Sequence, residues 1–259
     1  MKKVKAMIFI KSLMTALSTY SIIPMPQFEW NEKNMEYAIC FFPVVGVICG
    51  ALIFLLAKFG EVLGITDFFA SALAVCVPLL VSGGIHMDGF MDTVDALSSH
   101  APRERKLEIL SDPHTGAFAV IYLAVYLIMN IALIYDIYSM GTLTLICPVY
   151  VLSRSVSALC AVNMPSARKS GMLSSYTNNA KKTVVNITMA LTAAISCMVM
   201  LFVSPVMAAF AIGAGLIWTI IYCALAKKEF GGVTGDTAGF FLQLFELFCI
   251  LGIWLGEMI

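Results

Sequence analysis

Long runs of apolar residues recur along the chain and are separated by short polar segments. Seven of these runs are long enough for a helix to cross a hydrocarbon core of about 30 Å. They lie at residues 39–59, 68–85, 117–135, 141–162, 184–203, 207–226 and 239–259. The runs lack the strand-like alternation of apolar and polar positions that is typical of a membrane barrel. The pattern therefore predicts an all-α polytopic membrane bundle with about seven transmembrane helices.

An eighth apolar stretch, residues 6–26, differs from the others. It contains Lys11, several hydroxyl side chains, and Pro24 and Pro26 near its end. The basic start of the chain makes a cleaved signal peptide one interpretation, but Lys11 interrupts the apolar core that such a peptide needs. An interfacial or re-entrant helix beside the bundle fits these residues better.

The amino-acid composition is typical of a membrane protein, and it limits the kinds of partner that the protein is expected to bind. Hydrophobic residues make up 60% of the chain and charged residues 12%, whereas soluble domains carry about 25% charged residues. The lipid bilayer is therefore a partner, and the formal net charge of zero gives no reason to expect nucleic acid. Because no linker, repeat or CxxC motif divides the chain, we expect a single integral membrane domain over residues 1–259.

The basic residues are distributed unevenly between the two sides of the predicted bundle. If residues 6–26 do not cross, all Lys and Arg residues except Lys58 and Arg154 fall in segments on one side. Because loops rich in Lys and Arg remain in the cytoplasm, we predict that this side is cytoplasmic in a multi-pass protein of the cell membrane. These segments are residues 1–38, 86–116, 163–183 and 227–238.

Three aspartates follow the second apolar run, in the sequence GGIHMDGFMDTVD at 83–95. Asp88, Asp92 and Asp95 are spaced i, i+4 and i+7, which at about 100° per residue places them on one face of a helix. Three carboxylates this close repel one another unless a cation neutralises them, and Mg²⁺ prefers oxygen ligands. We therefore predict a Mg²⁺ site, with a solvated polar helix end as the simpler alternative.

The same polar segment contains two further candidates. Asp112 lies where the chain re-enters the membrane, and a turn at Pro113 and Gly116 could bring its carboxylate back to the first cluster as a fourth metal ligand. His86 precedes Asp88 by two residues, and it is a candidate base, phosphate donor or partner of the metal ligands. The alternative is a structural histidine at a helix end.

Two other loops on the basic side supply groups that an anionic substrate needs. One contains Arg168, which can bind phosphate through two hydrogen bonds, and Lys169, which acts as a point charge. The other is the glycine-rich segment KKEFGGVTGDTAG, which contains Asp236 and precedes a predicted helix whose backbone N–H groups can hold phosphate. Basic residues also flank membrane spans as ordinary topology signals. Together with the aspartates, the two loops indicate a site for Mg²⁺ and a phosphate-containing ligand.

Two charged residues lie inside predicted spans. Arg154 and Glu246 would each be costly at membrane depth without a partner. Structural pairing with each other and contact with the substrate are both open from the sequence.

These motifs together resemble the cobalamin synthase family, the adenosylcobinamide-GDP ribazoletransferases, over nearly the whole chain. The most specific part is a GGxHxDGxxDxxD run that is followed by RxxxLEIxxD. The matching stretches are FFPVVGVICG at 41–50, GGIHMDGFMDTVDAL at 83–97, RERKLEILSDPHTGAFAV at 103–120, LSR at 152–154, ARKSGM at 167–172 and GGVTGDTAG…ELF ending at 248.

The resemblance implies a transferase that joins α-ribazole, or its 5′-phosphate, to adenosylcobinamide-GDP, releases GMP and requires Mg²⁺. The family usually has Ser-Arg where this chain has Pro113 and His114, so a phosphate contact from that arginine is missing or moved to His114. The family also has two glutamates three residues apart near the end, where this chain has Gln243 and Glu246.

The chemistry that fits these residues is phosphoryl-group transfer with metal clamping. Mg²⁺ on the aspartates would bridge the pyrophosphate of the corrinoid, and His86, Asp88 or Asp92 would accept the proton of the attacking 5′-hydroxyl. Arg168 and Lys169 would hold phosphate oxygens.

Two alternatives remain for the function, and a homo-oligomer is left open. The first alternative is a lipid synthase like the CDP-alcohol phosphatidyltransferases, but the alanine and arginine that usually follow their second aspartate are missing. The second is a cation transporter, but the acids gather at one end of the predicted bundle and not at the bilayer midplane.

Overall fold

The structure, a computed structural model, describes residues 2–26, 35–168 and 170–259, and in these ranges the chain folds into helices. The longer helices are α1 (Lys2–Tyr20), α3 (Phe42–Leu63), α4 (Asp67–Ser82), α5 (Ile85–Ser98), α7 (Ala117–Ser139), α8 (Cys147–Asn163), α10 (Lys182–Val203), α11 (Pro205–Leu225) and α12 (Gly235–Glu257). The short ones are η1 (Ala38–Phe41), α6 (Arg103–Ile109), η2 (Leu143–Ile146), α9 (Met172–Asn179) and the π-helical η3 (Ala226–Phe230). The all-α prediction is confirmed.

Six of the seven predicted spans correspond to described helices, or to helices with a flanking short turn, that are long and apolar enough to cross a membrane. Their outer faces expose large apolar side chains such as Phe202 and Ile220, as expected where helices contact lipid. The chain is therefore a multi-pass membrane bundle. These spans are Ala38–Leu63, Ala117–Ser139, Leu143–Asn163, Lys182–Val203, Pro205–Phe230 and Gly235–Glu257.

The remaining predicted span, 68–85, is interrupted. Helix α4 has 16 residues, which at 1.5 Å per residue gives about 24 Å, less than the hydrocarbon core. Gly83 and Gly84 follow with φ of 63° and 80°, a conformation that glycine adopts without strain, and the chain bends by 94° into α5. Helices α4 and α5 together form a broken span or a re-entrant pair, so the aspartates lie on a helix that runs across the bundle.

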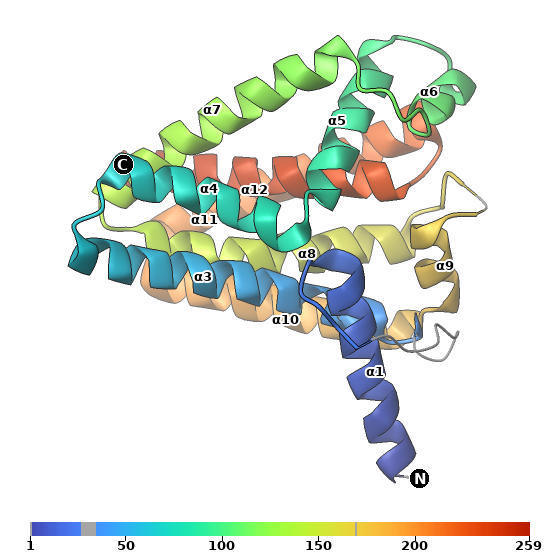
Figure 1. Ribbon diagram of the computed structural model, residues 1–259, viewed down its shortest axis with the longest axis horizontal. Coiled ribbons are helices and arrows are strands. Elements are labelled where there is room, and N and C mark those ends of the chain that lie inside the picture. The colour runs from blue at the N-terminus through green and yellow to red at the C-terminus, as the bar shows by residue number, and fades with distance from the viewer. Residues whose placement is uncertain (1, 27–34, 169) are drawn as a thin grey trace.

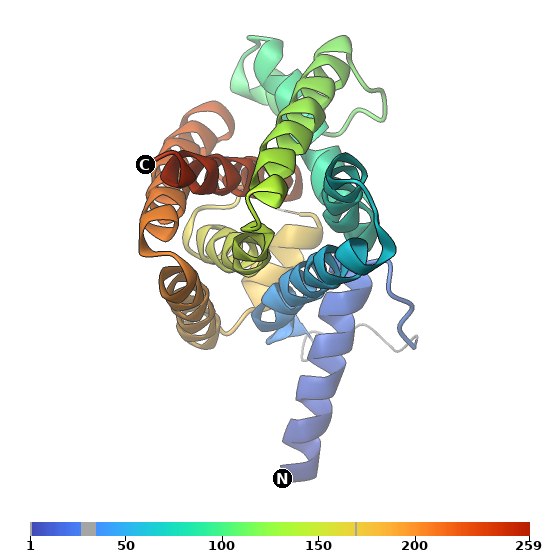
Figure 2. The same cartoon turned by 90° about the vertical axis from the view of Figure 1, so that its left-hand side faces the viewer.

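The long helices run side by side along one direction, which is horizontal in Figure 1. Helices α8 and α12 are the central ones, since 67% and 61% of their spans are buried, against 22% for α10. Helix α5 leaves this direction and packs extensively on α12 (Figures 1 and 2). One end of the bundle therefore gathers α5, α6, α9 and the loop before α12.

Helix α1 extends away from the bundle, crosswise to the long helices (Figures 1 and 2). A 2.6 Å hydrogen bond between the hydroxyls of Thr19 and Tyr176 joins it to α9. The following segment is held by a 2.9 Å hydrogen bond from the Ile22 N–H to the Val81 carbonyl of α4. The interfacial or re-entrant position of this helix stays a prediction.

Candidate functional site

Helices α5 and α12 pack closely because glycines face the opposite backbone. A Cβ added at Gly89 would lie 2.7 Å from the carbonyl oxygen of Asp236, and one added at Gly239 would lie 2.7 Å from that of His86. These distances leave no room for a side chain, and small residues at such positions let two helices approach. As a result Asp88, the residue before Gly89, lies beside the first turn of α12.

The carboxylates of Asp88, Asp92 and Asp236 form a group that we call the carboxylate cluster. The charges of Asp88, Asp236 and, more weakly, Asp95 all act on the Asp92 carboxylate, and the charge of Asp88 also acts on the carboxylate of Asp236. Arg168 opposes them, with its Nη1 3.5 Å from Oδ2 of Asp236. Among the described residues, three carboxylates thus face one guanidinium, which leaves an excess of negative charge.

Asp95, which lies on the same face of α5, has a different partner. Its two carboxylate oxygens accept hydrogen bonds from the backbone N–H groups of Gly116, at 2.6 Å, and Ala119, at 2.8 Å. These N–H groups belong to the start of α7 and have no acceptor within their own helix. A Cβ at Gly116 would lie 2.7 Å from the Asp95 carboxylate, so this contact also requires glycine. Asp95 therefore caps α7.

Asp112 and His114 pair with each other on the exposed loop between α6 and α7. Oδ1 of Asp112 accepts hydrogen bonds from the His114 N–H, at 3.0 Å, and from its ring nitrogen Nδ1, at 2.7 Å. The backbone hydrogen bond is the main reason why the pKa of Asp112 is lowered. The His114 side chain is 89% exposed.

The four predicted metal ligands are therefore not assembled as one set. Asp88 and Asp92 lie in the carboxylate cluster, whereas Asp95 and Asp112 bind backbone and histidine partners. Within the described ranges, no three His, Cys, Asp or Glu side chains form a group that could hold a metal ion. Asp236, which was predicted to bind substrate, takes the place beside Asp88 and Asp92.

The two loops predicted to bind an anion lie side by side. The N–H of Ala167 donates to the Val233 carbonyl at 3.0 Å, and the N–H of Val233 donates to the Pro165 carbonyl at 2.9 Å. A Cβ at Gly232 would lie 2.1 Å from the Pro165 oxygen, so this close approach depends on glycine.

Arg168 connects these loops to α6. Its Nη2 donates to the Leu107 carbonyl at 2.9 Å and to the Ser111 hydroxyl at 2.8 Å, while Nη1 faces Asp236. Its side chain remains about one third exposed, so Arg168 is partly accessible. Lys169, the second predicted phosphate ligand, lies outside the described residues.

Two adjoining cavities open beside the carboxylate cluster. The larger of the two, which we call the main cavity, has a volume of about 260 Å³ and lies between α1, α3, α5, α8, α9 and α12, and Asp88 and Asp236 line it. The polar cavity, of about 140 Å³, is lined by Arg168, hydroxyl side chains and the start of α12. Asp236 belongs to the walls of both, so the two cavities meet at the cluster.

His86 lines the main cavity between aromatic rings. Its ring centroid lies 5.6 Å from that of Phe42 and 6.4 Å from that of Tyr20. Nε2 of His86 is buried and has no hydrogen-bond partner among the described residues. Tyr20, Phe42 and Ser157 also line the cavity, and the sequence does not single them out, because in so apolar a chain they do not differ from residues that face lipid or core.

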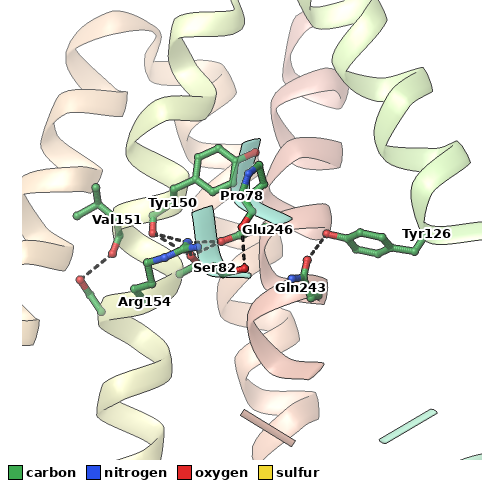
Figure 3. Close-up of polar contacts among 10 residues, drawn as sticks. Pro78, Ser82, Tyr126, Tyr150, Val151, Arg154, Gln243 and Glu246 are labelled. Atoms are coloured by element: carbon green, nitrogen blue, oxygen red, sulfur yellow. Dashed lines mark hydrogen bonds and ion pairs between the residues drawn. The ribbon is translucent and has the colours of Figure 1, made fainter. Parts of the chain in front are cut away.

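Arg154 and Glu246 form an ion pair in the bundle centre, between α8 and α12 (Figure 3). Nη1 of Arg154 also donates to the Tyr150 carbonyl at 2.9 Å, and Glu246 accepts from the Ser153 hydroxyl at 2.7 Å. Both charged side chains are at most 2% exposed, and neither is among the residues that line the two cavities. This geometry favours structural pairing over substrate contact.

Gln243 lies one turn of α12 before Glu246 and belongs to the same buried region. Its side-chain oxygen accepts a 2.5 Å hydrogen bond from the Tyr126 hydroxyl of α7 (Figure 3). A neutral amide therefore occupies the position where the family commonly has a second glutamate, and it joins α12 to α7.

Comparison with known proteins identifies relatives along almost the entire chain. The family model described as cobalamin-5-phosphate synthase matches residues 12–254. A protein of Lachnoclostridium phytofermentans is 40% identical over 249 residues, which cover 96% of this chain and 95% of the relative. A protein of Clostridium botulinum is 32% identical, with coverage of 92% and 94%. Both relatives are named adenosylcobinamide-GDP ribazoletransferase.

A more distant relative with the same name, from Desulforamulus reducens, is 29% identical and covers 96% of this chain. No solved structure matches the chain significantly. The matched range 12–254 contains every motif on which the resemblance rests, and the resemblance is confirmed. The chain belongs to the cobalamin-5-phosphate synthase family.

Proposed function

We propose that this protein is an adenosylcobinamide-GDP ribazoletransferase, which joins α-ribazole or its 5′-phosphate to adenosylcobinamide-GDP and releases GMP. Family membership over residues 12–254 supports this activity. The proposed mechanism is supported mainly by the carboxylate cluster, which faces Arg168 where the two cavities meet. Carboxylates that can hold a cation, next to a guanidinium group that can bind phosphate, are suited to phosphoryl-group transfer.

In this proposal the pyrophosphate of adenosylcobinamide-GDP binds at the polar cavity. Arg168 would contribute its accessible N–H groups, and the hydroxyls of Ser174 and Thr234 line the same space. The N-terminus of α12 adds favourable backbone N–H groups beside Gly235.

Mg²⁺ suits the donor chemistry of the carboxylate cluster. This ion is usually held by one or two carboxylates, while waters and substrate phosphates complete its coordination. A set of three preassembled ligands is therefore not needed, and the negative excess at Asp88, Asp92 and Asp236 is the feature that a cation would relieve. When bound, Mg²⁺ would offset negative charge on the phosphates and on the departing GMP.

The proposed reaction forms one bond and breaks one bond at phosphorus. An acceptor hydroxyl bonds to the phosphorus that carries the cobinamide, and the bond from that phosphorus to the GMP oxygen breaks, with its electron pair leaving on GMP. Arg168 would stabilise this charge, and a carboxylate of the cluster would take the hydroxyl proton. A 5′-phosphate acceptor has no free 5′-hydroxyl, because its 5′-oxygen is already esterified, so the attacking group is then another ribose hydroxyl and not the expected 5′-hydroxyl.

We further propose that the cavities open to the cytoplasm in the cell membrane. The distribution of Lys and Arg supports this orientation, because Arg105, Arg168 and Lys227 all lie at the bundle end that carries α5 and α6. Single cysteines at these three positions, in a cysteine-free chain, should resist an impermeant thiol reagent in intact cells and react after lysis. Ready labelling in intact cells would reverse the orientation.

The activity is tested by measuring GMP release from the purified protein in lipid nanodiscs. GMP should form only when adenosylcobinamide-GDP and α-ribazole, or its 5′-phosphate, are both present, and a chelator should stop it. Asp67→Asn is a matched control, because Asp67 begins α4 at the far end of the bundle. GMP release that does not depend on the acceptor would identify a hydrolase and contradict the proposed transfer.

A further inference from the structure

A third hollow lies on the opposite side of α5 from the carboxylate cluster. It has a volume of about 470 Å³ and is lined by α5, α7 and α12, and we call it the apolar groove. Phe90 and Val94 line it from α5. They follow Asp88 and Asp92 by two residues each, which at about 100° per residue places them on the opposite helix face. Figure 1 shows α7 leaning away from α12 towards this end of the bundle, with α5 between them.

The apolar groove occupies one half of the membrane-spanning layer. Helices α7 and α12 both begin at the end of the bundle where α5 lies, since Asp95 caps α7 and Asp88 lies beside the first turn of α12. The groove extends along α7 from Phe118 to Met129, which at 1.5 Å per residue is about 17 Å. On α12 it ends at Leu247, near the middle of that span. One leaflet of a hydrocarbon core of about 30 Å is about 15 Å thick, so the groove has the length of one leaflet.

The walls of the apolar groove become less polar with depth. Ser98 and His100 line its shallow end, and Tyr122 lies within the first two turns of α7, a depth at which tyrosine is common in membrane proteins. Deeper in the groove, the Tyr126 hydroxyl is already bound to the Gln243 side chain, at 2.5 Å. The other lining residues are aliphatic, aromatic or methionine. Among the described residues, the deep part of the groove therefore offers no free polar side chain.

The apolar groove continues the lipid-facing surface of the bundle. Phe118, Tyr122 and Val125 line it from α7, and each of them is 51–52% exposed. They belong to a span of which only 28% is buried inside the protein. Because the outer faces of the spans contact lipid, the groove is in contact with the bilayer along α7.

We propose that the apolar groove binds one acyl chain of a membrane phospholipid, with the headgroup at the end that carries Ser98 and His100. An empty groove would leave the atoms of its walls without van der Waals partners. A chain inside it contacts three helices, whereas a lipid on the outer face of a single helix contacts only that face. This lipid is therefore held longer than its neighbours, and it packs against the face of α5 opposite the aspartates.

Two other occupants fit the apolar groove less well. The substrates of the proposed transfer carry phosphates and sugars, and burying such groups without partners is unfavourable. A helix of a second copy of the chain would have to end at the middle of the membrane to match the depth of the groove. Its last backbone carbonyls would then lack partners in the hydrocarbon core. An acyl chain ends at this depth and has no polar group there.

The test counts the phospholipids that the full chain retains. The protein is taken from nanodiscs of dioleoyl phosphatidylcholine into detergent, and bound lipid is counted by native mass spectrometry as the detergent washes are extended. One phospholipid per chain should persist after the surrounding lipids are lost. When the phosphatidylcholine carries a photoreactive diazirine in the middle of one acyl chain, the persistent lipid should crosslink to α5, α7 and α12 within the groove.

Variants that fill the apolar groove supply the comparison. Val125→Trp narrows it from α7 and should lose most of the retained lipid, and Val94→Phe should do the same from α5. Val199→Trp is the matched control, because Val199 is a lipid-facing valine of α10 that is 47% exposed. It should retain lipid as the native protein does.

Thermal stability gives a second readout. Dioleoyl phosphatidylcholine added to the delipidated native protein should raise its melting temperature by mass action, and this shift should shrink in Val125→Trp but not in Val199→Trp. Dioctanoyl phosphatidylcholine should give a smaller shift, because its chains fill only part of the groove.

Three results would overturn the lipid site, and none of them depends on GMP release. The first is loss of all phospholipid together with the surrounding lipids, and the second is equal retention by Val125→Trp and Val199→Trp. The third is a lipid-free pair of chains that Val125→Trp separates, which would assign the groove to a second copy.

Discussion

The bundle contains two groups of charged side chains, and they differ in how their charge is balanced. In the centre, the Arg154–Glu246 pair is closed: each charge has its counterpart, and both side chains are almost fully buried. At one end, the carboxylate cluster has more acids than bases among the described residues and opens into two cavities. A balanced ion pair can hold two helices in register. An accessible cluster with an excess of negative charge is instead suited to bind a positively charged ligand such as a metal ion.

The largest expected effect is the loss of turnover when the cluster loses a charge. Asp92→Asn or Asp88→Asn should lower kcat by about 10³-fold or more, because each removes part of the site for the cation that offsets phosphate charge. The double variant should be little worse than either single one, because the residues act as a unit. GMP release measures this effect.

The same variants separate a binding cluster from a structural one. Mg²⁺ should raise the melting temperature of the native protein by mass action, and this shift should shrink in both variants. Without Mg²⁺ the variants should be at least as stable as the native protein, because carboxylate repulsion is reduced. Full activity of Asp92→Asn, or activity unaffected by excess chelator, would end the metal assignment.

At the central Arg154–Glu246 pair, the loss of one charge should instead lower the stability of the protein. Glu246→Gln leaves the buried Arg154 without its counterion and should cost about 3–5 kcal/mol of unfolding free energy. Denaturant titration in mixed micelles measures the loss, with Glu61→Gln at the exposed far end of α3 as control.

A double replacement decides between structure and substrate contact at this pair. Arg154→Met combined with Glu246→Leu removes both charges and should recover most of the lost stability. If the pair is structural, this variant should also recover activity. A stable but inactive double variant would show that Arg154 serves the reaction.

Arg168 has both a position at the site and a structural contact. It pairs with Asp236 of the cluster, and it also connects α6 to its own loop. Arg168→Ala should lower kcat/KM by the equivalent of about 1.5–3 kcal/mol, through the lost charge-assisted hydrogen bonds. Arg168→Lys should recover only part, because a lysine cannot reproduce the fork of donors. Unchanged kcat/KM in both variants would limit Arg168 to a topology signal.

The smallest effect is expected at Asp95, which shares a helix face with the cluster but caps α7. Asp95→Ala should cost about 0.5–2 kcal/mol of stability, as loss of a helix cap does, and should leave the Mg²⁺-induced shift in melting temperature intact. Asp95→Asn should keep most of the activity, because an amide oxygen can still accept the backbone hydrogen bonds. A reduced Mg²⁺ shift in Asp95→Asn would return this residue to the metal site.

The fold class, most of the spans and the location of the polar chemistry follow from the amino-acid sequence alone. Span prediction succeeds because the length of an apolar run and the bilayer thickness are both local quantities. It was incomplete at 68–85, because the bend at Gly83 and Gly84 depends on backbone conformation and not on hydropathy. The helical spacing of Asp88 and Asp92 is local as well, so their shared face was predictable.

Which of these groups come into contact depends on how the helices pack. Asp236 lies nearly 150 residues after Asp88, and it joins the cluster because glycines let α5 and α12 pack in contact. Asp95 leaves the predicted metal set because the start of α7 offers it unsatisfied N–H groups, and Arg154 meets Glu246 only across two central helices. Charge balance and cavity shape arise from contacts between distant segments, and the periodicity of one segment cannot encode them.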